Sequence, residues 1–156
     1  MSGKYERFST SIASISREIQ RIERTEMAKC GLTGPCAQSL LTIGRFPEGI
    51  PAARLAQLCE KDKAAISRTV AELEQAGLVR RAGASRYRAN LQLTEAGRKV
   101  AASIGKRAQL AVELAGEGLS AGQLERLYQV LDHIAQRLHT LGKTGLEPQD
   151  EQEETT

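Results

Sequence analysis

Aromatic residues are scarce in this sequence, and tryptophan is absent. Aromatics make up only 3% of the 156 residues, whereas hydrophobic residues make up 40%, so Leu, Ile, Val and Ala must fill the core. No apolar run approaches the roughly 18 residues of a membrane-spanning helix. The N-terminal stretch MSGKYERFSTS is polar and lacks the hydrophobic region of a secretory signal. We therefore expect a cytoplasmic protein that does not bind membranes.

Cysteine is also scarce. The three cysteines Cys30, Cys36 and Cys59 form no CxxC pair, which argues against a disulfide framework and against a zinc ribbon. In a reducing compartment they are free thiols. Cys30 and Cys36 flank the link between the first two predicted helices, and a thiol in the first turn of a helix can have a lowered pKa. Both are therefore redox candidates, and the alternative is that they are small buried hydrophobic residues.

Histidine occurs only twice, and the residues that catalysis requires are missing. His133 and His139 are six positions apart, so they do not share one face of a helix. No set of residues resembles a closed metal site. There is no glycine-rich phosphate loop, and no histidine lies near a plausible nucleophile. We therefore expect no metal, no cofactor and no catalytic residue, and we do not expect an enzyme.

Acidic residues are few in the middle of the chain. Residues 61–107 hold 11 basic and 4 acidic residues, a net charge of +7, although the whole chain carries only +3. Residues 142–156 hold one lysine and five acids and few apolar residues, so we expect an acidic, disordered tail. A concentrated basic segment is typical of a protein that binds a polyanion, and the alternative is a solvated basic surface.

Apolar residues recur at helical spacing near both ends of the chain. In the first predicted helix, at 8–27, and in the sixth, which ends near residue 141, the spacing alternates between three and four, which predicts two heptad seams. The seams consist of Phe8, Ile12, Ile15, Ile19 and Ile22 in the first helix and of Leu124, Leu127, Leu131, Ile134, Leu138 and Leu141 in the sixth. A compact domain needs neither seam, so we expect both to form a helical bundle with a second copy of the chain. The alternative is an intramolecular helix pair in a monomer.

Residues that can cap a helix precede the predicted helices between these ends. The caps predicted for the second, fourth, fifth and sixth helices are Thr33, Asp62, Thr94 and Ser120. Residues 46–51 are expected to form a loop, and a short third helix follows Pro51. The fourth helix, at about 63–76, has a predicted buried stripe of Ile66, Val70 and Leu73, and Gly77 is placed to end it. Residues 78–79 and 87–93 then predict two strands, and so a β-hairpin directly after the fourth helix.

Two short helices joined by a turn and followed by a hairpin describe a winged helix-turn-helix. In such a unit, the N-terminal residues of the second helix contact bases in the major groove. The residues predicted to do so are Lys63, Ala64, Ala65, Ser67 and Arg68. The hairpin adds four arginines within nine residues that contain no acid, namely Arg80, Arg81, Arg86 and Arg88, and such a ribbon suits the minor groove. Of these, Arg81, Arg86 and Arg88 are the predicted DNA contacts. The alternative is a hairpin that only covers the helices.

The predicted fold is mainly α with a small β-hairpin wing, and it divides into four regions. We expect an N-terminal dimerisation helix at 1–30 and a winged helix-turn-helix DNA-binding domain at 31–99. C-terminal dimerisation helices at 100–141 and the acidic tail at 142–156 complete the chain.

Motifs within residues 55–98 resemble the MarR family of bacterial regulators. They are AISRTVAELEQAGLVRR and, after the hairpin, LQLTEAGR. The resemblance implies a homodimer that binds a pseudo-palindromic operator in double-stranded DNA and usually represses nearby genes. Release by a small phenolic or lipophilic effector, by thiol oxidation or, in some members, by a metal is also implied. The wing of the family often carries Asp-x-Arg, where this chain has Ser85 and Tyr87, so the resemblance leaves open whether Arg86 or Arg88 enters the minor groove.

The sequence therefore predicts a MarR-type dimeric DNA-binding transcriptional regulator, a repressor released by a small-molecule ligand. One alternative is a thiol-based redox-responsive regulator of the same fold. Another is a winged-helix adaptor that binds proteins. Salt distinguishes the adaptor, because binding to duplex DNA weakens steeply with salt and binding through an apolar surface does not.

Overall fold

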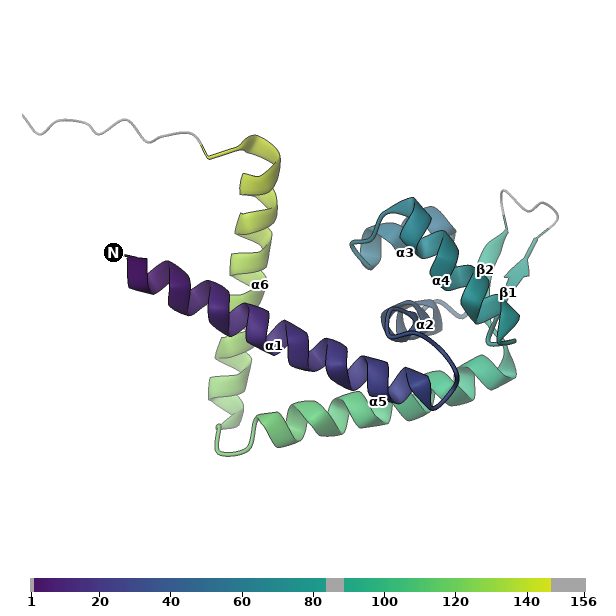
Figure 1. Cartoon of the computed structure of the whole chain (residues 1–156), viewed down its shortest axis with the longest axis horizontal. Coiled ribbons are helices and arrows are strands. Elements are labelled where there is room, and N and C mark those ends of the chain that lie inside the picture. The colour runs from purple at the N-terminus through teal and green to yellow at the C-terminus, as the bar shows by residue number, and fades with distance from the viewer. Residues whose placement is uncertain (1, 84–88, 147–156) are drawn as a thin grey trace, which may run out of the picture. The chain divides into compact units, whose positions relative to one another are not determined.

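The computed structural model of the chain describes residues 2–83 and 89–146 (Figure 1). In chain order, the elements are α1 (Ser2–Ala28), α2 (Cys36–Gly44), α3 (Ala52–Leu58), α4 (Lys63–Gln75), β1 (Val79–Ala82), β2 (Asn90–Leu93), α5 (Glu95–Ala115) and α6 (Ala121–Thr144). The fold is mainly α with one small hairpin, as the sequence predicts. No helix of the described ranges is long and apolar enough to cross a membrane.

Contacts divide the chain into two compact units, Met1–Leu110 and Ala111–Thr156, with the division falling inside α5. The core of the first unit is formed by aliphatic side chains of α2, α3, α4 and the hairpin. Met27, near the end of α1, and Ile104 of α5 belong to the same core. These two long helices are therefore anchored to the winged helix by part of their length.

The hairpin is antiparallel and packs one face on the core. Val79 lies opposite Leu93, and Arg81 lies opposite Leu91. Ile50, in a segment that the sequence indicates only as a loop, forms a β-bridge with Leu91. The Ile50 N–H donates to the Leu91 carbonyl at 3.0 Å, and the Leu91 N–H donates to the Ile50 carbonyl at 2.8 Å. This bridge ties the start of α3 to the wing.

Three of the four predicted caps are confirmed. The Asp62 carboxylate accepts from the Ala65 N–H at 2.7 Å, and the Thr94 hydroxyl accepts from the Gly97 N–H at 3.0 Å. Ser120 forms a full capping box with Gln123. The prediction for Thr33 is wrong, because Pro35 occupies the cap position of α2 and makes no side-chain cap. The Thr33 hydroxyl instead donates to the Glu72 carboxylate at 2.8 Å.

The second unit contains α6, which ends at Thr144 rather than near the predicted residue 141. None of its residues is buried. The first residues of the predicted tail, 142–144, are therefore helical. The rest of the acidic tail, from 147 to 156, lies outside the described residues.

Candidate nucleic-acid interface

Helix α4 is held by a buried apolar stripe. Ile66, Val70 and Leu73 recur at helical spacing, and their exposed fractions are 3%, 1% and 0%. The stripe, which the sequence predicts, belongs to the core, and the helix packs against α2 and α3. Because the three residues lie along one face, the opposite face of α4 must point to solvent.

The exposed face of α4 carries most of the predicted DNA-contacting residues. Lys63, Ala64, Ser67 and Arg68 are all exposed, and Ala65 is half-buried. We call the first four residues the reading face. The Ala65 carbonyl accepts from the Thr69 hydroxyl at 3.0 Å. The structure thus places two cations, one hydroxyl and one methyl group on a single solvent-facing surface.

The turn after α4 fixes where the wing begins. Gly77 has a φ of +72°, a conformation that side chains other than glycine rarely adopt. The Gly77 carbonyl accepts from the Thr94 hydroxyl at 2.7 Å, while the Thr94 N–H donates to the Leu78 carbonyl at 3.0 Å. Thr94 therefore joins the end of the hairpin and the start of α5 to the end of α4.

The wing arginines have different surroundings. Arg81 donates from Nε to the Glu74 carboxylate of α4 at 2.6 Å, and Arg80 is exposed. The structure therefore gives Arg81 an acidic partner on the protein. The predicted minor-groove residues Arg86 and Arg88, together with Ser85 and Tyr87, lie outside the described residues.

A contact that the sequence analysis did not find links α4 to the segment between α1 and α2. The Glu72 carboxylate accepts from the backbone N–H of Thr33 at 2.6 Å and from its hydroxyl at 2.8 Å. Burial alone raises the pKa of the Glu72 carboxyl, but the hydrogen bonds from Thr33 outweigh it and hold the pKa below the usual 4.5. The contact therefore stabilises the ionised form of Glu72.

The cysteines divide into two buried thiols and one exposed thiol. Cys36 is fully buried, and burial raises the pKa of its thiol from 9.0 to about 11. Of the two alternatives for Cys36, the structure therefore supports the small buried residue and not the thiol of lowered pKa, because removal from water outweighs the position in the first turn. Cys59 is buried, and its thiol donates to the Thr42 hydroxyl at 3.7 Å. Cys30 is exposed, so it is the remaining redox candidate.

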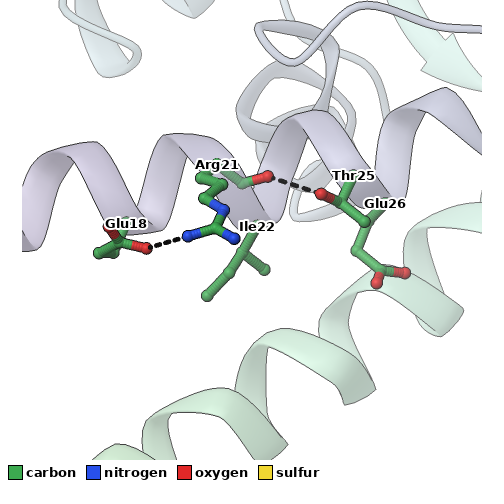
Figure 2. Close-up of a pocket in the computed structure, with 5 residues that line it drawn as sticks. All are labelled: Glu18, Arg21, Ile22, Thr25 and Glu26. Carbon is green, nitrogen blue, oxygen red and sulfur yellow. Dashed lines mark hydrogen bonds and ion pairs between the residues drawn. The ribbon is translucent and has the colours of Figure 1, made fainter.

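One pocket lies along α1 (Figure 2). Its volume is about 270 Å³, and its lining consists of Glu18, Arg21, Ile22, Thr25 and Glu26. The Arg21 guanidinium lies 3.4 Å from the Glu18 carboxylate. Pockets for drug-sized ligands are mostly apolar and occupy about 300–1,000 Å³. This charged lining, with one isoleucine, does not match the phenolic or lipophilic effector that the resemblance implies.

The predicted seam of α1 is exposed in the single chain, whereas the seam of α6 is exposed at three of its six residues and half-buried at Leu124, Ile134 and Leu141. Phe8, Ile12, Ile15, Ile19 and Ile22 of α1 have exposed fractions of 39% to 57%. On α6, Leu127, Leu131 and Leu138 have exposed fractions of 43%, 37% and 53%. Two apolar stripes of this length in contact with water are unusual for a monomer.

No group of three or more histidine, cysteine or acidic residues in the described ranges could hold a metal ion.

Comparison with known proteins agrees with this geometry. Residues 31–86, which begin after α1 and include α2, α3, α4 and β1, match the family model of the MarR family. Over this segment the chain is similar to the MarR family. A comparison with curated proteins gives no match.

Solved structures extend the likeness beyond the winged helix. The transcriptional regulator SlyA is 25% identical, with a TM-score of 0.76 over 84% of this chain and 93% of that chain. A MarR protein from Peptoclostridium difficile is 18% identical, with a TM-score of 0.78 over 85% of this chain and 88% of that one. MepR, a regulator of the Staphylococcus aureus multidrug efflux pump MepA, is 18% identical, with a TM-score of 0.63 over 84% and 98%. The chain therefore has the fold of MarR-family transcriptional regulators.

Proposed function

We propose that the chain is a homodimeric, cytoplasmic DNA-binding regulator that represses transcription by occupying a pseudo-palindromic operator. The observation that carries this proposal is the reading face of α4, which is exposed while the opposite face is locked in the core. A helix presented in this way can enter the major groove of B-DNA. The MarR-family fold supports the same role.

The chemistry of the reading face suits duplex DNA. Arg68 can donate two hydrogen bonds to the edge of a guanine, and Lys63 can neutralise a phosphate at the start of the helix. The Ala64 methyl permits close approach to a thymine methyl, and Ser67 can bond to a base or a phosphate. The face is cationic and includes no acid, as a surface that approaches phosphates requires.

Dimerisation supplies the second reading face. The apolar seam of α1 and three residues of the seam of α6 are exposed in one chain, and burial against a second copy would remove them from water. A two-fold dimer then places two α4 helices about 34 Å apart, which is one turn of DNA. An operator for such a dimer is an inverted repeat.

Release by a small-molecule effector completes the proposal. An effector lowers DNA affinity when it binds more tightly to dimers whose two reading faces are out of register with the major grooves. The MarR-family resemblance supports this form of control. The charged residues that line the pocket on α1 do not suit a lipophilic effector, so we expect the effector site to form in the dimer.

In vitro selection from a random duplex library, with the full-length protein as bait, tests the proposal. The expected product is an inverted repeat with half-site centres about 10 base pairs apart. Affinity for that duplex should fall steeply with salt, by about 0.9 log units per log unit of salt for each phosphate contact. Recovery of no enriched sequence, or binding indifferent to salt, contradicts a DNA-binding role and favours the adaptor.

Substitution of the reading face gives a second test. Arg68→Ala should lower discrimination between the selected duplex and a random duplex by about 1–3 kcal/mol without changing the oligomeric state. Gln75→Ala, at the other end of α4, is the matched control and should leave discrimination unchanged. If Arg68→Ala binds the selected duplex as selectively as the wild type, Arg68 does not contact a base.

A further inference from the structure

The two adjacent arginines of β1 point to opposite faces of the hairpin. Directly opposed residues in an antiparallel pair share a face, and successive residues of one strand alternate. Arg81 lies opposite Leu91 and shares its face with Val79, and both of these neighbours are buried. Arg80 lies opposite Gln92 on the other face, and both arginines are exposed as whole residues. The side chain of Arg81 therefore starts from the core-facing side of the wing.

From this face, Arg81 reaches the last turn of the DNA-reading helix. Its Nε lies 2.6 Å from Oε1 of Glu74, and the two side chains are only 32% and 33% exposed. An ion pair that is two-thirds shielded from water is screened less by salt than a fully exposed pair. The pair connects β1 to α4 across the Gly77 turn. It therefore constrains the angle between the wing and the reading helix.

The acid in this pair is notable because α4 is otherwise suited to a polyanion. The only acidic residues of α4 are Glu72 and Glu74, and both are engaged, Glu72 by Thr33 and Glu74 by Arg81. A free carboxylate this close to phosphates would oppose DNA binding by Coulomb repulsion. A carboxylate paired with an arginine on the wing is neutralised and can serve to position the wing.

We propose that Arg81 is a positioning residue that aligns the wing through Glu74, and that Arg80 is the arginine of this strand that contacts DNA phosphate. The inference rests on the proposed DNA-binding function. It gives Arg81, which the sequence places among the DNA-contacting residues, a different role. It also assigns two neighbouring arginines of identical chemistry to two separable tasks.

Matched substitutions separate the two roles by salt dependence. Affinity for the duplex recovered by selection is measured across a salt series for wild type, Arg80→Gln and Arg81→Gln. Loss of a phosphate contact lowers the slope of log affinity against log salt by about 0.9, so Arg80→Gln should show this decrease. Arg81→Gln should weaken binding about two- to fivefold with an unchanged slope, because a partly exposed ion pair stabilises by at most about 1 kcal/mol.

Removal of the Glu74 carboxylate distinguishes the two roles of Arg81, because they predict changes of DNA affinity in opposite directions. If Arg81 is a phosphate contact, Glu74→Gln frees it and removes a repulsive charge, so affinity should rise. If Arg81 positions the wing, Glu74→Gln should lower affinity about two- to fivefold. Glu60→Gln, which removes an exposed acid from the turn before α4, is the control and should raise affinity slightly or leave it unchanged.

A double variant with the pair exchanged, Glu74→Arg with Arg81→Glu, shows whether the single variants lose affinity through the ion pair or through misfolding. It keeps the net charge and restores an ion pair, so it should bind the duplex more tightly than either single glutamine variant. A lower slope for Arg81→Gln, tighter binding by Glu74→Gln, or no recovery in the exchanged pair overturns the proposal while wild-type binding still stands. Failure of the wild type to bind any duplex would instead remove the proposed function.

Discussion

The carboxylate of Glu72 accepts two hydrogen bonds from Thr33, a residue 39 positions earlier in the chain. One bond comes from the backbone N–H and the other from the hydroxyl, so a single side chain of α4 fixes the main chain between α1 and α2. The link joins the helix that carries the reading face to the segment that follows the exposed seam of α1.

The first prediction concerns the pH dependence of stability at this contact. Because the folded-state pKa of Glu72 lies below its usual 4.5, the ionised carboxylate stabilises the fold above that pH. This stabilisation is lost as the pH falls through the folded-state pKa. Glu72→Gln should therefore lower the free energy of unfolding at pH 7, by about 1 kcal/mol, and the difference from wild type should shrink as the pH falls below 4.5.

Urea denaturation at several pH values measures this difference. Thr33→Val removes the hydroxyl bond but keeps the backbone bond, so its effect at pH 7 should be smaller than that of Glu72→Gln. A difference between wild type and Glu72→Gln that stays constant from pH 7 to pH 3 would show that the carboxylate charge does not matter.

The second prediction concerns the close approach of α5 to the wing. A Cβ atom added at Gly97 would overlap the carbonyl oxygen of Leu78, which also accepts from the Thr94 N–H. Gly97→Ala should therefore destabilise the protein, despite the gain of about 1 kcal/mol that alanine offers over glycine inside a helix. Thermal unfolding measures the change.

Gly105→Ala, in the same helix, is the matched control. Its added Cβ meets only the Leu41 side chain at 3.9 Å, an ordinary contact. Helix propensity then dominates, and this variant should be as stable as wild type or more stable by up to about 1 kcal/mol. Equal effects at the two glycines would contradict the close approach at Gly97.

Local signals explain which parts of this fold could be predicted from the sequence. The cap at Asp62, the stripe of Ile66, Val70 and Leu73, and the glycine at 77 depend on residues within one helix and its ends. The structure confirms all of them. The reading face follows directly, because a helix with one buried stripe exposes the opposite side.

Contacts between distant segments could not be predicted in the same way. Nothing in the sequence near Thr33 indicates that its hydroxyl will bond to Glu72 instead of capping α2. The bridge of Ile50 to Leu91 joins a predicted loop to a strand, and no local pattern marks it. The sequence leaves open whether Cys36 is a reactive thiol or a small buried residue, because burial, which raises its pKa, depends on the whole core. For Arg81, alternation along β1 was a usable signal, since it places this arginine on the same face as buried Val79.

The third prediction concerns the reactivity of the thiols. Cys30 is exposed, whereas Cys36 is fully buried with a pKa of about 11. Only the thiolate is nucleophilic, so iodoacetamide at pH 8 should alkylate Cys30 in the folded protein and leave Cys36 unmodified. Mass spectrometry of digested protein over a time course measures both rates. Alkylation of Cys36 should become fast only in denaturant.

The difference in exposure between Cys30 and Cys36 also predicts which thiol would respond to an oxidant. If peroxide releases the protein from DNA, Cys30→Ser should abolish the response, and Cys36→Ser should not. A response that survives in Cys30→Ser but disappears in Cys36→Ser would contradict the assignment of Cys30 as the accessible thiol.

The last prediction concerns the exposed seam of α1. Ile15 is 57% exposed in the single chain, so a charged residue there costs little in a monomer. If the seam is buried in a homodimer, Ile15→Glu places an unpaired charge in an apolar interface and should shift the protein to monomer. Affinity for the two-half-site duplex should then fall by about a hundredfold, because each half-site is bound independently. Ala13→Glu adds the same charge on the opposite side of α1 and should remain dimeric. Light scattering after size-exclusion chromatography measures the mass, and a monomeric wild type, or a dimeric Ile15→Glu, would exclude this seam as the interface.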